Sequence, residues 1–129
     1  MTAKPDFLTV EEVLKIHEDQ IARYGGEPGL RDKGMLHSAI AMPASGSQEK
    51  YHHEDLFEMA AAYLYHIVRD HPFVDGNKRT GLVSALVFLD LNGVNIRASQ
   101  ADIERIAREV AEGKANKTSI ADFFRRHGA

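Results

Sequence analysis

The sequence predicts an all-α protein of about six helices, and two kinds of observation support this prediction. Apolar residues recur at intervals of three and four in six segments, which are separated by stretches containing glycine, proline or asparagine. Side chains suited to capping a helix N-terminus precede several of these segments. Between the helical segments, residues 94–96 are short and extended at most.

The first two helices are expected at residues 9–23 and about 33–41. Thr9 and Glu12 have the spacing of a capping box, in which each side chain accepts a hydrogen bond from the other residue's backbone N–H. Apolar residues fall on one face of the first segment, and Gly25 follows it as a stop signal.

A loop at residues 42–52 is followed by the third helix, at residues 54–70. Pro43 and Gly46 break the helical pattern in the loop. The third helix carries a wide apolar stripe, and the small residues at 60–62 predict close packing against another helix.

The fourth helix is expected at residues 77–91. It is apolar on most sides, which is typical of a central buried helix, and Gly93 lies at its C-terminal stop. A fifth helix follows Ser99, with Asp102 as the capping-box partner, and Gly113 closes it.

The sixth helix is expected to begin at Thr118 or Ser119 and to bury an aromatic pair. Cationic residues follow at its C-terminus, where the helix dipole favours positive charge. They are Arg125, Arg126 and His127.

Composition sets limits on the class of protein. With 129 residues, the chain suits one domain, residues 1–129, around a single hydrophobic core. The net charge of −3 gives no general attraction to nucleic acid or anionic membranes, and no apolar run approaches about 18 residues. Since the chain has no cysteine and no apolar signal-peptide core, we expect a cytoplasmic protein that binds neither membrane nor nucleic acid directly.

The stretch at residues 71–81, between the third and fourth helices, concentrates the chemically useful side chains. Pro72 disfavours right-handed helical geometry at His71, so the third helix should end at about Asp70. The following helix begins within the same stretch. Its unpaired N–H groups and positive dipole end favour an anion.

Each polar residue of this loop suits one part of a phosphate-transfer site. His71 supplies an imidazole, the side chain that most often acts as a general base, and Asp75 is a hard oxygen ligand of the kind that Mg²⁺ takes. The remaining residues can bind phosphate oxygens through backbone N–H groups, an amide, a point charge and a planar fork: Gly76, Asn77, Lys78 and Arg79.

A purely structural interpretation accounts for several of these residues singly. A histidine before a proline is commonly a helix-end residue, and Asp-Gly-Asn is a common turn. Phe73 is expected to anchor the loop in the core, and His17 to be a satisfied core or boundary histidine. The combination of residues within one short loop is what favours a functional site.

The stretch resembles the signature of the Fic/Doc family, which has the Fido fold and the pattern H-x-F-x-D/E-G-N-G-R-x-x-R. Two positions depart from that pattern, Lys78 and Leu82, and both departures resemble the Doc branch, the death-on-curing toxins, whose loop reads H-x-F-x-D-A-N-K-R. The resemblance covers roughly residues 7–125. The matching residues are His71, Phe73, Asp75, Gly76, Asn77 and Arg79, with further Doc-like stretches at residues 23–29, 56–58, 84–86 and 92–94.

The resemblance implies a helical Fido fold and an enzyme that transfers part of a nucleoside triphosphate, such as ATP, to a protein hydroxyl group. His71 would deprotonate the hydroxyl and Asp75 would hold Mg²⁺. The residues that would bind the phosphates are Gly76, Asn77, Lys78 and Arg79.

The two branches of the family imply different transferred groups. In the Doc branch, the combination seen at Lys78 and Leu82 goes with a reversed nucleotide and γ-phosphate transfer to a threonine of elongation factor Tu, which arrests translation. Fic-type AMP transfer is the alternative, because Gly76 and Pro72 are Fic-like.

We expect regulation by a separate antitoxin, because the sequence shows no clear match to the inhibitory helix of many Fic proteins. Many Fic proteins carry an inhibitory helix with the pattern S/T-x-x-x-E-G/N. The nearest match here runs from Ser45 to Glu49, but Lys50 follows and the stretch is loop-like. The resemblance also makes residues 42–52 the flap that positions a target segment over the active site.

Two other function classes stay open. One is a non-catalytic helical binding module that keeps the loop for packing. The other is a metal-dependent phosphohydrolase that uses His52 and His53, although neighbouring histidines point apart and chelate one ion poorly. A solvated helix start is the favoured explanation of the stretch from His52 to Asp55.

Overall fold

The computed structural model describes residues 4–47, 50–51, 53 and 55–129, and within these the chain forms six α-helices, which confirms the all-α prediction. A 3₁₀ turn, η1, spans Met42–Ala44. The helices are α1 Val10–Tyr24, α2 Lys33–Ala41, α3 Leu56–Asp70, α4 Asn77–Leu91, α5 Gln100–Ala111 and α6 Lys117–His127.

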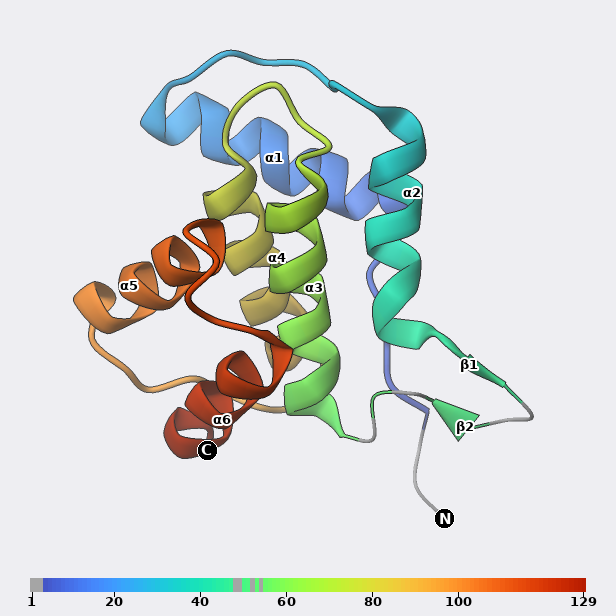
Figure 1. The fold of residues 1–129 in the computed structure, drawn as a ribbon, viewed down its shortest axis with the longest axis vertical. Coiled ribbons are helices and arrows are strands. Elements are labelled where there is room, and N and C mark those ends of the chain that lie inside the picture. Colours follow the sequence, from blue (N-terminus) through green and yellow to red (C-terminus); the bar gives the residue numbers. More distant parts are fainter. Residues whose placement is uncertain (1–3, 48–49, 52, 54) are drawn as a thin grey trace.

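The helices α3 and α4 form the centre of the molecule and share the most extensive contact between elements (Figure 1). α2 packs on one side of α3, and α5 and α6 cover the other side. α1 crosses the end at which α3 finishes and α4 begins, so the loop between the two central helices lies next to α1.

The close contact between α3 and α4 depends on small residues. Ala60, Ala61 and Ala62 on α3, for which the sequence predicted close packing against another helix, are fully buried. On α4, a Cβ atom added at Gly81 would lie 3.2 Å from the backbone oxygen of Leu64, which is closer than most real contacts. The glycine therefore sets the distance between the two helices.

Local capping explains where most of the helices begin. The expected capping box at α1 is present, with Thr9 and Glu12 each bonding the other's backbone N–H at 3.1 and 2.9 Å. At α5, Ser99 accepts from the Asp102 N–H, but the Asp102 carboxylate pairs with Arg105 at 3.1 Å, so the expected full capping box does not form.

Two other predictions differ from the structure. α6 begins at Lys117, because Asn116 rather than Thr118 or Ser119 supplies the cap and forms a capping box with Ser119. The expected loop at residues 42–52 contains a short antiparallel pairing between β1, Gly46–Ser47, and β2, Lys50–Tyr51. The segments of β1 and β2 are too short to show the alternation of apolar and polar residues by which a strand is predicted.

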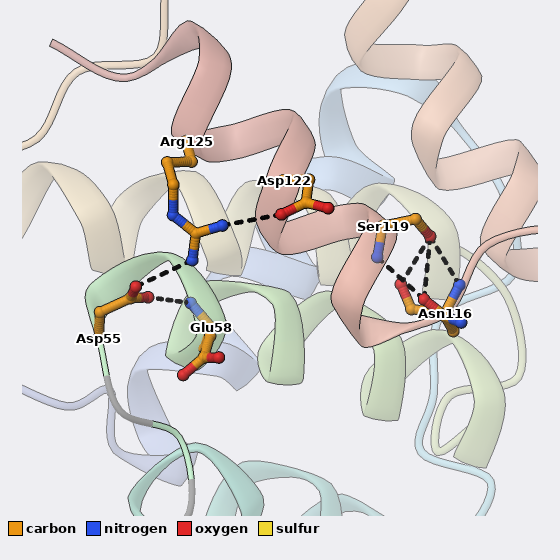
Figure 2. A network of polar contacts seen from close by, with 6 residues as sticks. All are labelled: Asp55, Glu58, Asn116, Ser119, Asp122 and Arg125. Atoms are coloured by element: carbon orange, nitrogen blue, oxygen red, sulfur yellow. Dashed lines mark hydrogen bonds and ion pairs between the residues drawn. The ribbon is translucent and has the colours of Figure 1, made fainter.

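Figure 2 shows a polar network that joins the start of α3 to α6. Asp55 caps α3 by accepting from the Glu58 N–H at 2.8 Å, and its other oxygen pairs with Arg125 of α6 at 2.9 Å. Arg125 also contacts Asp122 of its own helix at 2.8 Å. Since these groups are largely exposed, the network orients the two helices more than it stabilises them.

Lys117 makes a second polar link between α6 and α3. Its Nζ lies 3.2 Å from Nε2 of His66 and 3.4 Å from Nε2 of His53. Burial, followed by the charge of Lys117 and by His53, lowers the pKa of His66 to about 4. His66 therefore accepts a hydrogen bond as a neutral ring at physiological pH.

None of the helices in the part of the chain described here combines the length and the apolar character that crossing a membrane requires.

We expect Gly81→Val to lower the free energy of unfolding by about 1–3 kcal/mol, because the added carbons collide with the backbone of α3. Urea unfolding followed by circular dichroism measures this change. Gly34→Val, at an exposed helical glycine, is the control. Its Cβ would lie 3.3 Å from the movable Asp32 Oδ1, which caps α2, and not against backbone, so the loss should be smaller than at Gly81. Equal losses in both variants would contradict the packing argument.

Stability should also fall in acid through His66. The ring titrates near pH 6.5 in an unfolded chain and near 4 in the folded one, so the unfolded state binds more protons between these values. This contribution to stability is present above about pH 6.5 and is lost as the pH drops toward 4. Unfolding curves of the parent and His66→Gln at several pH values test this, since their difference should vary with pH only in that window.

Candidate active site

The loop that carries the predicted site begins where α3 ends. The last helical residue is Asp70, which confirms the expected boundary, and His71 has φ 52° and ψ 55°. Among the described residues, His71 is the only one other than glycine with a positive φ. The left-handed conformation, uncommon for histidine, turns the chain sharply out of the helix and leaves His71 exposed.

The segment that precedes α2 holds the loop in place through hydrogen bonds. The carbonyl of Pro72 accepts from the N–H groups of Arg31 and Asp32 at 2.7 and 3.0 Å. The Arg31 side chain bonds the carbonyls of His71 and Asp70 at 2.6 and 3.0 Å, so a cation caps the C-terminus of α3. The backbone around His71 is therefore fixed from outside the loop.

Asn77 shapes the loop from inside. Its Oδ1 accepts from the Phe73 N–H at 3.0 Å and its Nδ2 donates to the Phe73 carbonyl at 2.9 Å. The Asn77 side chain is only 5% exposed and Phe73 is 1% exposed, which confirms Phe73 as a core anchor. Binding of phosphate by Asn77 stays a prediction, and its backbone N–H is the group best placed for it.

His17 of α1 supports the same loop. Its ring stacks on Phe73 with centroids 3.8 Å apart and planes 5° apart, and its Nε2 donates to the Asp75 carbonyl at 2.8 Å. This buried histidine is thus satisfied, as expected, and it holds the backbone of the loop rather than a ligand.

The N-terminus of α4 is open to a ligand. Gly76 is the N-cap in left-handed geometry, with φ 79° and ψ 16°, and no side chain caps the helix. The other five helices of the described chain each begin with a side-chain cap. The first backbone bond within α4 is from the Thr80 N–H to the Gly76 carbonyl, at 2.9 Å. The N–H groups of residues 77–79 therefore have no helical partner and suit an anion.

Asp75 is held as a carboxylate. Its Oδ2 accepts from the Glu27 N–H at 3.1 Å and its Oδ1 from the Gly76 N–H at 2.8 Å. These two bonds, in that order, hold the pKa of Asp75 below its usual value, and the positive charge of Arg79 acts in the same direction. An ionised oxygen ligand of this kind fits Mg²⁺.

The structure brings all the predicted site residues together around one cavity of about 470 Å³. Arg69 and Ala111 also line this cavity, and the sequence analysis missed both. Arg69 lies in the last turn of α3, where the helix dipole alone accounts for a cation, so only its position beside His71 distinguishes it. The full lining is Val68, Arg69, His71, Asp75, Gly76, Asn77, Lys78, Arg79 and Ala111.

A second, smaller cavity of about 230 Å³ shares two lining residues with the first, Lys78 and Arg79. α5 contributes Arg108 to it, a cation that no motif in the sequence indicated. Leu82, at the position of the family's second arginine, is 8% exposed and lines this second cavity with an apolar surface.

The other two stretches considered in the sequence lie partly outside the described residues. Of the histidine-rich stretch, His52 and Glu54 are outside, and His53 lies against Lys117. No three His, Cys, Asp or Glu side chains converge on a metal position within the described ranges. Of the stretch from Ser45 to Glu49, Glu49 is outside, and Ser45 follows the 3₁₀ turn in an extended conformation.

Comparison with known proteins supports the relationship that the loop indicates. A model of the "Fic/DOC family" matches residues 7–89. "Protein kinase doc" of Escherichia phage P1 is 39% identical over 120 residues, which cover 92% of this chain and 93% of that protein. "Toxin Doc" of Mycolicibacterium smegmatis is 39% identical over 119 residues, 90% of this chain and 88% of that protein. With its motif loop, its helical fold and these relatives, the chain belongs to the Fic/Doc family.

Proposed function

We propose that this protein is a Doc-like toxin that transfers the γ-phosphate of ATP to a hydroxyl group of a protein. Both relatives are Doc proteins, and one of them is named as a protein kinase. The Fic/Doc family uses nucleotides.

One observation carries the proposal: a single cavity joins His71 to the uncapped start of α4. The backbone N–H groups at that start bind phosphate oxygens, and the left-handed Gly76 lets the phosphate approach the chain closely. Lys78 and Arg79 are exposed at the same end and add charge. A polyphosphate bound there lies beside the imidazole.

In the proposed reaction, the oxygen of the target hydroxyl attacks the γ-phosphorus of ATP. The new O–P bond forms as the bond from that phosphorus to the bridging β–γ oxygen breaks, and ADP leaves with that oxygen. His71 takes the hydroxyl proton. Lys78, Arg79 and the helix start stabilise the charge on the phosphoryl oxygens, which is the main catalytic contribution in such transfers.

Asp75 is the residue that would hold Mg²⁺. Its carboxylate is kept ionised and oriented by two backbone N–H groups, and this fits a hard cation shared with phosphate oxygens. The ion supplies neutralisation of phosphate charge.

AMP transfer is the alternative reaction at the same site. It would place the α-phosphate next to His71 and needs a cation for the distal phosphate at the position of Leu82. Leu82 is nearly buried and apolar, which favours phosphate transfer, while Gly76 keeps the Fic-like feature of the loop.

The proposed target is a threonine of elongation factor Tu, on the basis of the resemblance to the Doc branch. The proposed regulator is a separate antitoxin whose segment folds on binding. The conformation of Ser45 supports regulation in trans. Ser45 is extended and is followed by the strand β1, so no inhibitory helix begins at this residue.

Labelled ATP distinguishes phosphate transfer from AMP transfer. After incubation with a cell extract, we expect label from γ-³²P-ATP to enter protein and label from α-³²P-ATP to stay out. Mass spectrometry of the modified target should find an added phosphate. A nucleotide adduct would instead establish the AMP transferase and overturn the kinase proposal.

His71→Ala should lower the rate of label transfer by about 10²-fold or more, because the general base is lost. Its ATP affinity should stay close to that of the parent. His37→Ala, at an exposed position on α2, is the matched control and should transfer label normally. Full toxicity of His71→Ala in cells would favour the non-catalytic binding module.

A further inference from the structure

We propose that Tyr24, Gly26 and Glu27, at the end of α1 and in the loop that follows, are positioning residues that align Asp75 and Arg79 for a magnesium-bound triphosphate. We call these three residues the clamp. The inference rests on the proposed function, and it extends that function to a part of the chain far from the motif in sequence.

The first contact of the clamp is made by the backbone. The Glu27 N–H donates to Asp75 Oδ2 at 3.1 Å, across 48 residues of sequence. The Gly76 N–H donates to the other oxygen, Oδ1, at 2.8 Å. The two donors come from different segments, so together they fix the orientation of the carboxylate while each oxygen keeps lone-pair capacity for a cation.

The second contact explains why residue 26 is glycine. A Cβ atom added at Gly26 would lie 2.8 Å from Asp75 Oδ2, closer than real side chains approach one another, and 3.1 Å from Ile21 Cδ1, which is a tight contact. Gly26 also has φ +117°, a conformation that other residues avoid. A side chain here would turn the Asp75 carboxylate away or push the loop back, and either movement breaks the Glu27 bond.

The third contact holds a cation of the site. The Arg79 guanidinium carbon lies 5.1 Å from the centroid of the Tyr24 ring, within the range of a cation–π interaction. Tyr24 is 61% exposed, so burial in the core does not account for its position. The ring limits the conformations of an otherwise mobile arginine and so lowers the entropy cost of binding phosphate.

Alanine at Gly26 tests the clamp against a control at the neighbouring glycine. Gly25 also has a positive φ, +82°, but a Cβ added there meets nothing within 4 Å. Gly25→Ala therefore reproduces the backbone strain without the collision with Asp75. Binding of a non-hydrolysable ATP analogue is measured by calorimetric titration at a series of Mg²⁺ concentrations. The result is the Mg²⁺ concentration at which binding of the analogue is half-maximal.

We expect Gly26→Ala to raise that Mg²⁺ concentration by about 10-fold or more, as loss of a group that orients a metal ligand does. Gly25→Ala should change it less than about 3-fold. The exchange rate of the Glu27 amide, followed by NMR without ligand, should rise in Gly26→Ala and not in Gly25→Ala. Equal shifts in the two variants, or no shift in either, would overturn the role of Gly26.

The ring is tested by paired substitutions at Tyr24. Tyr24→Leu should raise the KM for ATP by about 2- to 5-fold at saturating Mg²⁺, whereas Tyr24→Phe, which keeps an aromatic face, should stay near the parent value. A loss of similar size in both would contradict the cation–π contact. These outcomes are separable from the proposed function, because an active His71→Ala variant would refute the reaction, while the amide exchange of Glu27 reports on the clamp alone.

Discussion

The close approach of α3 and α4 at Gly81 is the constraint on which the rest of the structure depends. A Cβ atom there would lie only 3.2 Å from the backbone oxygen of Leu64, so glycine allows the two central helices to pack closely. The short loop that joins them keeps the end of α3 beside the start of α4. His71 ends α3 and Gly76 begins α4, so this arrangement places a titratable ring next to an open helix N-terminus.

The loop between these helices has little freedom despite its exposure. The Asn77 side chain forms hydrogen bonds within the loop, and Arg31 and its neighbouring backbone form hydrogen bonds to it from another segment. His17 and Glu27 bond to Asp75 from the α1 side. Such support is what a site for phosphoryl transfer requires, because positioned charge does most of the catalytic work there and a loosely held loop would lose it.

Charge in the molecule is distributed unevenly. The chain as a whole carries a net charge of −3, yet cations from three helices line the two cavities that share Lys78 and Arg79. Arg69 comes from α3, Lys78 and Arg79 from α4, and Arg108 from α5. A local concentration of positive charge of this kind favours an anionic ligand such as the polyphosphate proposed above. Two carboxylates accompany these cations, Asp75 in the first cavity and Glu104 in the second. Asp75, which lies beside the start of α4, is the one that suits a magnesium ion.

The sequence by itself determined the helices and the chemistry of the motif, because caps, breakers and apolar periodicity act over a few residues. The bounds of α4 and the capping box at Thr9 were predictable for that reason. Tertiary structure alone decided the left-handed turn at His71, the bonding of the Asn77 amide to Phe73, and the contacts of Gly26 and Arg108 with the site. Each of these depends on groups that folding brings together from other segments, or on how the loop is held between two packed helices, and local sequence patterns do not report such contacts.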